Sequence, residues 1–210
     1  VGTGAEALLK SLIEEGVETI YGYPGGAIMP VYDKLMDFEG RITHYLTRHE
    51  QGAAHAAQAY AMVTGKPGIC FATSGPGATN LITGLADAMI DSTPLVCISG
   101  QVSASLLGSD AFQETDVIGI SMPITKWNYQ ITSADEICDV IAKAFFYANS
   151  GRPGPVLIDI TKNAQQEEVE FNYKKRTQVR SYIPNPQPDP VKIEEAAALI
   201  NSAERPFVLC

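Results

Sequence analysis

The sequence has little cysteine and no long apolar run, and both shortages narrow the class of protein. Its four cysteines show no CxxC spacing, so a zinc ribbon or a thioredoxin-like motif is excluded. Cys70, Cys97 and Cys138 lie inside apolar runs, and Cys210 is the last residue. Reduced, buried thiols are typical of a reducing compartment, so we expect a cytoplasmic protein. No apolar run approaches the length of a membrane span, so we expect no membrane partner.

Basic residues are also scarce, with 15 Lys and Arg against 24 Asp and Glu and a net charge of −9. The one basic run, residues 174–176, lies in a polar segment and is typical of a solvated linker. Because no basic face is indicated, we expect no nucleic-acid partner.

Apolar residues make up 45% of the 210 residues, enough for one large α/β domain and part of a second. Helical and strand-like runs alternate along the chain, which predicts a mostly parallel sheet with helices on both faces. We expect helices at 5–16, 28–38, 50–64, 77–90 and 133–148, and strands at 17–23, 42–46, 68–73, 94–99, 124–131 and 155–160.

The alternation stops near residue 163, which we take as the end of the first domain, 1–163. Residues 164–190 are polar, then charged, then proline-rich (IPNPQPDP), which predicts an extended interdomain linker. Residues 191–210 predict a helix and the beginning of a strand, at 206–210, that would start a second α/β domain. We therefore expect this chain to be part of a longer protein.

Two glycine-rich loops follow predicted strands. The first, FATSGPGATN, has Asn80 where a dinucleotide-binding loop has its third glycine, and the strand ending at residue 100 carries no acid for a ribose. It indicates either a helix N-terminus beside a small ligand or a tight turn without one. The second, YGYPGGA at 21–27, lies at a similar junction, so both loops open toward one rim of the sheet.

Three other patterns indicate no separate chemistry. His49 and His55 are six residues apart, a spacing that puts them on different helix faces, so we predict no metal ligands here. The acidic stretch 110–116 fits no EF-hand or two-metal spacing and is predicted to be a loop facing the crevice. No GxSxG motif supports Ser74 as a nucleophile.

Glu50 stands between a strand-like run and a helix made largely of alanine. Such a helix can pack closely on several sides, as at a subunit interface. The carboxylate could be a simple helix-end acid that interacts with the helix dipole. It could equally be a partly buried group used for proton transfer. The residues alone leave both possibilities open.

Six segments together resemble one family, the large catalytic subunit of acetolactate synthase (acetohydroxyacid synthase), through most of residues 1–163. TSGPGATN and the glutamate are shared by many thiamine-diphosphate enzymes, whereas GYPGGAIMPVYD and DAFQE point to acetolactate synthase. The segments are YGYPGGAIMPVYD (21–33), RHEQGAAHAAQAYA (48–61), TSGPGATN (73–80), SGQV (99–102), GSDAFQETD (108–116) and GRPGPVLIDITK (151–162).

The resemblance implies roles for individual residues. Glu50 would hydrogen-bond the aminopyrimidine ring of thiamine diphosphate and assist proton transfer. Gly26 would lie beside the reacting carbon, and Gln113 would act in the substrate pocket, which gives the proposed catalytic set. The remaining matches are cofactor contacts at Pro24, Gly25, Pro76, Asn80 and Arg152 (the last to a flavin) and channel residues at Ala27, Phe112 and Lys162.

The resemblance also implies the partners and the reaction. Expected cofactors are thiamine diphosphate, FAD, and Mg²⁺ whose ligands lie outside this chain. The expected reaction decarboxylates pyruvate and condenses the hydroxyethyl unit with pyruvate or 2-ketobutyrate, in branched-chain amino-acid synthesis. We expect a homodimer or homotetramer with the active site between subunits, a possible regulatory small subunit, and no activity from this chain alone. The alternatives are a pyruvate oxidase, an FAD-free catabolic acetolactate-forming enzyme, and a non-enzymatic binding or dimerisation domain.

Overall fold

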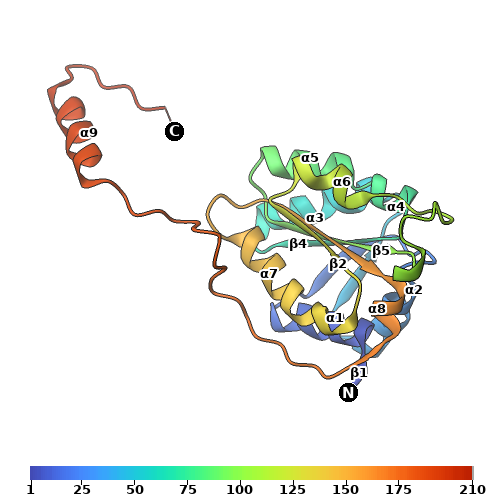
Figure 1. The fold of residues 1–210 in the computed structure, drawn as a ribbon. Coiled ribbons are helices and arrows are strands. Elements are labelled where there is room, and N and C mark those ends of the chain that lie inside the picture. Colours follow the sequence, from blue (N-terminus) through green and yellow to red (C-terminus); the bar gives the residue numbers. More distant parts are fainter. Residues whose placement is uncertain (210) are drawn as a thin grey trace.

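A computed structural model describes residues 1–209 and shows a six-stranded parallel sheet (Figure 1). The strand order is β3-β2-β4-β5-β7-β6, and each neighbouring pair runs parallel. Because the strands are parallel, their carboxyl ends lie at one edge of the sheet. The bounds are β2 Thr19–Gly22, β3 Thr43–Leu46, β4 Gly68–Ala72, β5 Leu95–Gln101, β6 Trp127–Ile131 and β7 Pro155–Thr161.

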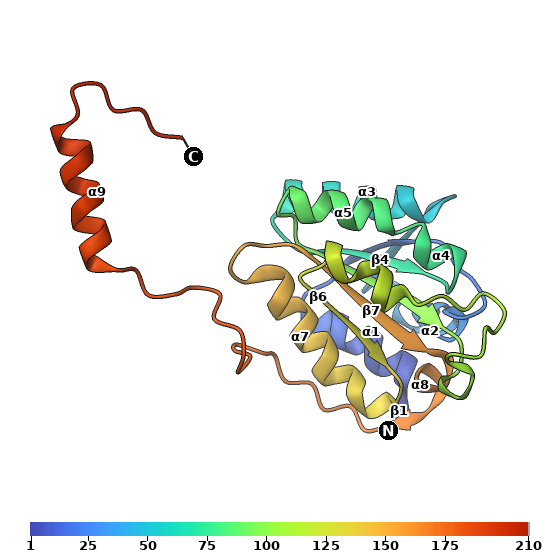
Figure 2. The same cartoon turned by 45° about the horizontal axis from the view of Figure 1, so that its top comes forward.

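Helices cover both faces of the sheet, which confirms the predicted fold class. Figure 2 shows α1 and α7 on one face and α3 and α5 on the other. The bounds are α1 Gly4–Glu14, α2 Met29–Leu35, α3 Glu50–Thr64, α4 Pro76–Thr79, α5 Ile82–Ile90, α6 Val117–Ser121, α7 Ile137–Asn149 and α8 Lys162–Gln166.

Each face of the sheet has its own apolar core. On the α1 and α7 side, Leu8, Leu12 and Ile141 are fully buried with the alternate residues of the central strands. On the α3 and α5 side, Ala57 and Leu85 pack on the opposite side chains. Burying a leucine or isoleucine stabilises the fold by about 1.5–3 kcal/mol, so these two layers hold the strand ends, and the loops that follow them, in place.

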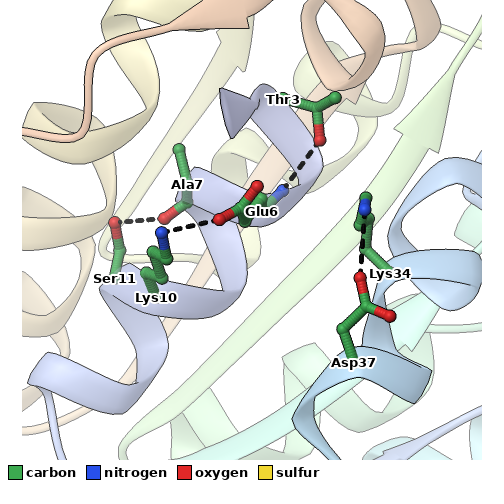
Figure 3. Close-up of polar contacts among 7 residues, drawn as sticks. All are labelled: Thr3, Glu6, Ala7, Lys10, Ser11, Lys34 and Asp37. Carbon is green, nitrogen blue, oxygen red and sulfur yellow. Dashed lines mark hydrogen bonds and ion pairs between the residues drawn. The ribbon is translucent and has the colours of Figure 1, made fainter. Parts of the chain in front are cut away.

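The first helix illustrates how local sequence fixes an element (Figure 3). Thr3 caps α1, because its Oγ1 accepts a hydrogen bond from the Glu6 amide at 3.3 Å. Lys10 pairs with Glu6 at 2.6 Å, one turn away. The buried Ser11 hydroxyl donates to the Ala7 carbonyl at 2.7 Å, so its polar group is satisfied inside the core. The same view shows Lys34, in the last turn of α2, paired with Asp37 at 3.0 Å.

The alanine-rich helix α3 has the predicted bounds and ends at Gly65, which has a φ of 70°. Its alanines permit a close approach to α5, since a Cβ on Gly84 would lie 2.5 Å from the Ala54 Cβ. The helix predicted at 77–90 is instead two helices, α4 and α5. The bend lies at Asn80, the C-cap residue of α4, whose side chain is engaged elsewhere.

The chain continues to pack on the domain beyond residue 163. After α8, β8 (Glu168–Val169) pairs antiparallel with β1 (Gly2–Thr3). Phe171 and Tyr173 then pack against the core. We name residues 168–176 the strap. The first part of the predicted linker is therefore a short helix and a docked strand rather than an extended tether.

Two residues of the basic run at the end of the strap make ion pairs, so the run is not simply a solvated stretch. Lys175 pairs at 2.9 Å with Glu15, whose side chain is only 5% exposed, and Arg176 pairs with Asp139. The strap therefore carries charges that neutralise acids on α1 and α7.

Beyond the strap, Tyr182 still packs on Phe146 and Tyr147 and donates to the Ser150 carbonyl at 2.9 Å. The chain then leads away to α9 (Pro190–Ser202), which stands apart from the sheet in both views (Figures 1 and 2). Residues 206–209 form no strand, since nothing lies beside them to complete a ladder, and Cys210 lies outside the described residues. Cys70, Cys97 and Cys138 are free and buried, as predicted. Within residues 1–209 the helices are too short or too polar to cross a membrane.

Candidate functional site

Two glycine-rich loops and the start of α3 meet at the carboxyl edge of the sheet. Residues 23–28 follow β2, residues 73–77 follow β4, and Glu50 begins α3 shortly after β3. This edge of a parallel sheet is where α/β proteins bind ligands.

Glu50 is buried at this edge, with 7% of its surface exposed. Its Oε2 accepts a hydrogen bond from Asn80 Nδ2 at 2.9 Å. Its Oε1 lies against Gly77, because a Cβ added there would come within 3.2 Å of that oxygen. Among the described residues, Oε1 receives no hydrogen bond, so it can accept or share a proton with a ligand.

The capping of α3 is performed by His49, whose Nδ1 accepts from the Gln51 amide at 3.2 Å. Glu50 is therefore not needed as a side-chain cap. Because a buried carboxylate is costly unless something compensates it, this position is better explained by a ligand than by helix stability.

The surroundings of Glu50 are poorly solvated. Burial is the largest effect that raises the pKa of the Tyr32 hydroxyl, followed by electrostatic interaction with Cys70 and Glu50. Burial also leads the causes that raise the pKa of the Cys70 thiol, with Cys97 and Glu50 adding to it. Burial lowers the pKa of His44, whose Nε2 lies 3.1 Å from the Tyr32 hydroxyl. The Glu50 carboxylate therefore lies in a region of low polarity.

The loop at 23–28 packs against Thr73 and Gln165 and is open at Gly26. A Cβ on Gly25 would lie 2.5 Å from the Thr73 Cβ, so this glycine is required for close packing. The Ala27 amide donates to Thr73 Oγ1 at 3.2 Å, and its carbonyl accepts from Gln165 Nε2 at 2.8 Å. Gly26 has no atom within 4 Å of the place its Cβ would take, so a ligand can approach its backbone.

The second loop links Glu50 to the acidic segment. Gly75 has a φ of +58°, and a Cβ there would lie 2.6 Å from the Gln113 carbonyl oxygen. Pro76 is exposed and opens α4, where its missing N–H is no loss. Gln113 is therefore packed on the turn that leads to Gly77 and Glu50.

Several residues predicted to act together thus lie on connected loops, namely Gly25, Gly26, Ala27, Glu50, Pro76, Asn80 and Gln113. Pro24 is half-buried in the first loop, and Phe112 is 87% exposed next to Gln113.

Two predicted residues lie apart from this group. Lys162 begins α8 and lines a cleft of about 330 Å³ with Met29 and Asp33, on the α2 side of the first loop. Arg152 precedes β7 and so lies at the opposite edge of the sheet. Its guanidinium donates to Ser92 Oγ at 2.7 Å and to two carbonyls at the end of α5.

Thr73 and Gln165 were missed from the sequence, although they hold the Ala27 amide and carbonyl. Thr73 directly follows β4, a position that could have drawn attention to it. Gln165 is fully buried and its partner is 138 residues away, so nothing local in the sequence reveals it.

The site contains groups suited to a flat, nitrogen-containing ring rather than to a metal. Within residues 1–209 there is no group of three or more His, Cys, Asp or Glu side chains that could hold an ion. A buried carboxylate with one oxygen free, beside backbone without side chains, can instead pair with a ring nitrogen that carries a proton.

Comparison with known proteins agrees with this geometry. Residues 2–120 match the family model described as "Thiamine pyrophosphate enzyme, N-terminal TPP binding domain". The match covers more than half of the chain, and the chain therefore belongs to this family.

The curated relatives specify the resemblance further. The chain is 54% identical over 206 residues to "Acetolactate synthase" of Mycobacterium bovis and 50% identical to "Acetolactate synthase large subunit" of Corynebacterium glutamicum. It is 48% identical over 209 residues to "Probable acetolactate synthase large subunit" of Methanocaldococcus jannaschii. Each match covers 98% of this chain but only 33%, 33% and 35% of the relative. The chain thus spans about a third of the length of these relatives, and the resemblance predicted from the motifs is confirmed.

Proposed function

We propose that this chain is the pyrimidine-binding domain of an acetolactate synthase large subunit. The reaction is the decarboxylation of pyruvate and the joining of its hydroxyethyl unit to pyruvate or 2-ketobutyrate, in branched-chain amino-acid synthesis. The observation that carries the proposal is the buried Glu50 carboxylate, held by Asn80 and free at Oε1, at the same edge of the sheet as the open backbone of Gly26. Relatives about half identical to the chain are named acetolactate synthases, and the family resemblance implies the reaction.

Glu50 holds the proton at the pyrimidine ring nitrogen in this proposal. When bound, thiamine diphosphate supplies a carbon nucleophile for attack on a ketoacid carbonyl. Asn80 orients the carboxylate by donating to Oε2, and Gly77 leaves room for Oε1 to face the ring. The low polarity around Glu50 keeps water from competing for that proton.

The two loops form the walls of the site. Pro24, Gly25 and Gly26 would line one side of the cofactor, and Pro76 the other. Gly26 would act together with Glu50 as part of the catalytic group, because only a residue without a side chain leaves the reacting centre uncovered.

The substrate is proposed to enter past a second group of residues. Gln113 would contact the ketoacid from its place against Gly75, and Phe112, which is exposed in this chain, would line the channel. Ala27 and Lys162 would complete the channel on the side of α2 and α8.

Two further cofactors follow from the resemblance. Mg²⁺ is proposed to be bound by residues outside this chain. FAD is proposed as well, but Arg152 fits it poorly as it stands. Its Nε and Nη2 are engaged with Ser92 and α5, which leaves Nη1 for a flavin.

Assembly is proposed to complete the site. The exposed face of α3 carries small residues, Gly52 and Ala59, that allow a second subunit of a homodimer or homotetramer to approach closely. A regulatory small subunit and a cytoplasmic location are also proposed. Because the rest of the enzyme is needed to hold the diphosphate, this chain alone should be inactive.

Product analysis of the full-length enzyme tests the proposal. With pyruvate, thiamine diphosphate and Mg²⁺, we expect acetolactate to form, and only when FAD is present. Formation of acetate or acetyl phosphate would replace the proposal with a pyruvate oxidase. Acetolactate without any need for FAD would indicate the catabolic type, and no turnover would favour a binding or dimerisation domain.

A further inference from the structure

A fully buried carboxylate, Asp159, lies on β7 and has no part in the site described so far. Ser99 Oγ donates to its Oδ1 at 2.7 Å. Gln101 and Gln130 donate to its Oδ2 at 3.0 and 2.9 Å. An apolar residue would pack in a strand interior without the cost of desolvating a charge, so the carboxylate is better explained by what it holds.

Asp159 holds the side-chain amide of Gln101. Gln101 is 2% exposed, and both the nitrogen and the oxygen of its amide make hydrogen bonds. Its Nε2 donates to Asp159 and also, at 3.1 Å, to the carbonyl of Thr115. Its Oε1 accepts from the Val102 amide at 2.9 Å. Gln101 therefore connects the sheet to the backbone of a segment 14 residues further along the chain.

That segment, residues 108–116, which we call the 108–116 loop, is shaped from within by Glu114. The Glu114 carboxylate accepts from the amides of Gly108 and Ala111. Asp110 and Gln113 have φ values of 55° and 57°, a conformation that side chains rarely adopt without outside support.

The loop has little apolar packing on the sheet beneath it. A cleft of about 320 Å³ separates it from the ends of β5 and β6, and the residues that line the cleft include Glu114, Asp116 and Gln130. Gln101 and Thr115, which are joined by a hydrogen bond, both line this cleft. This bond fixes the loop two residues from Gln113, where Gln113 packs against Gly75.

We propose that Gln101 is a positioning residue, oriented by Asp159, which holds the 108–116 loop where Phe112 and Gln113 meet a 2-ketoacid substrate. The inference rests on the proposed function for the identity of that substrate. The placement of the loop itself does not depend on it.

The chain offers a matched control for this role. Gln130 donates to the same Asp159 oxygen and lines the same cleft, but it makes no hydrogen bond to the loop backbone among the described residues. If Gln101 serves only to satisfy the buried carboxylate, the two glutamines are equivalent. If it positions the loop, they are not.

The test compares Gln101→Met with Gln130→Met in the full-length enzyme, because methionine keeps the length and flexibility of glutamine. Hydrogen exchange of the free enzyme, without substrate, reports the loop. We expect exchange at 108–116 to rise about fivefold in Gln101→Met and to stay near wild type in Gln130→Met. The KM for pyruvate should rise about fivefold in Gln101→Met with little change in kcat, since a less populated binding geometry lowers apparent affinity.

Equal effects of the two variants on loop exchange and on KM would overturn the proposal, because both would then act only through Asp159. Should Gln101→Met fail to fold, Asp159→Asn keeps the shape of the site and removes the charge that orients the Gln101 amide. That variant should raise loop exchange in the same segment, and unchanged exchange would also contradict the proposal. If the wild-type enzyme forms no acetolactate, the proposed function fails, while the exchange result still decides the role of Gln101.

Discussion

At the scale of the residue, Gly25 and Gly26 are adjacent glycines with different reasons to lack a side chain. Gly25 packs against Thr73 so closely that a Cβ would lie 2.5 Å from the Thr73 Cβ. Gly26 faces open space, where the fold itself imposes no such limit. The first glycine is thus explained by packing and the second by access to the backbone.

This difference predicts opposite phenotypes for two alanine variants. Gly25→Ala should lower the free energy of unfolding of this chain by about 1–3 kcal/mol, because the Thr73 side chain must move. Gly26→Ala should change stability by less than about 0.5 kcal/mol and should lower the activity of the full-length enzyme. Denaturant unfolding and pyruvate kinetics of both variants check this. Equal stability losses would show that the Gly26 site is not open.

Asp159 gives a prediction for pH. Burial, the largest effect, raises the pKa of the Asp159 carboxyl from 3.8 to about 6, although hydrogen bonds from Ser99, Gln130 and Gln101 lower it. The folded state therefore binds this proton more tightly than the unfolded chain does. The resulting contribution to stability is complete below about pH 3.8 and is lost as the pH rises through 6.

Asp159→Asn removes this titration. Between pH 4 and pH 7, the stability of the variant relative to wild type should rise by on the order of 2 kcal/mol. Denaturant unfolding at several pH values measures the difference. Parallel curves for the two proteins would mean that Asp159 titrates normally in the folded chain.

At the scale of the element, the packing of the strap at 168–176 bears on where the first domain ends. Phe171 and Tyr173 pack on the core, and the Tyr173 hydroxyl donates to the buried Glu15 carboxylate. Burial is the largest effect that raises the pKa of Tyr173, which agrees with the packing of its ring against the core. We therefore propose that the first domain extends through the strap, beyond the predicted 1–163.

Two truncations test this boundary. Removing residues 187–210 should leave the Tm within about 2 °C, because α9 has no buried residue and stands apart from the sheet. Removing residues 167–210 should lower the Tm by about 6–12 °C, since the apolar area of the strap is lost. Calorimetry of both chains measures the two Tm values. An identical Tm would show that the packing of the strap does not stabilise the domain.

The sequence allowed the regular elements to be predicted because period and caps are local signals. The bounds of α3 were correct, since an extended His49, an alanine run and Gly65 mark them. The break between α4 and α5 was missed, because the apolar pattern continues through it while Asn80 turns to Glu50. The docking of the strap was missed too, since it depends on Glu15, far away in the sequence.

For the site, the motifs predicted the loops but not the residues that hold those loops in place. Gln101 and Asp159 stand in apolar strands, where a polar residue is a visible anomaly, yet only the register of β5 and β7 brings them together. Arg152 shows the converse, because its motif is close to the family pattern while the fold places it at the other edge of the sheet.

At the scale of the whole molecule, the exposed face of α3 predicts assembly. Ala59 is exposed in this chain and small enough for a second subunit to pack on it. Ala59→Arg should shift the full-length enzyme toward monomers and lower its activity in proportion, because a buried unpaired charge at an interface is costly. Sedimentation velocity measures the change. Glu39→Arg, on an exposed turn, is the control, and an unchanged oligomer in Ala59→Arg would place the interface elsewhere.

The most direct test of the proposed role of Glu50 is the kcat of full-length Glu50→Gln with pyruvate, thiamine diphosphate, Mg²⁺ and FAD. Glutamine keeps the size and the bond to Asn80 but cannot hold the proton as a carboxylate does. We predict a fall of about 10²–10⁴ in kcat, with the exposed Glu39→Gln near wild type. A Glu50→Gln enzyme as fast as wild type would contradict the role, and Glu50 would then be only an acid at the start of a helix.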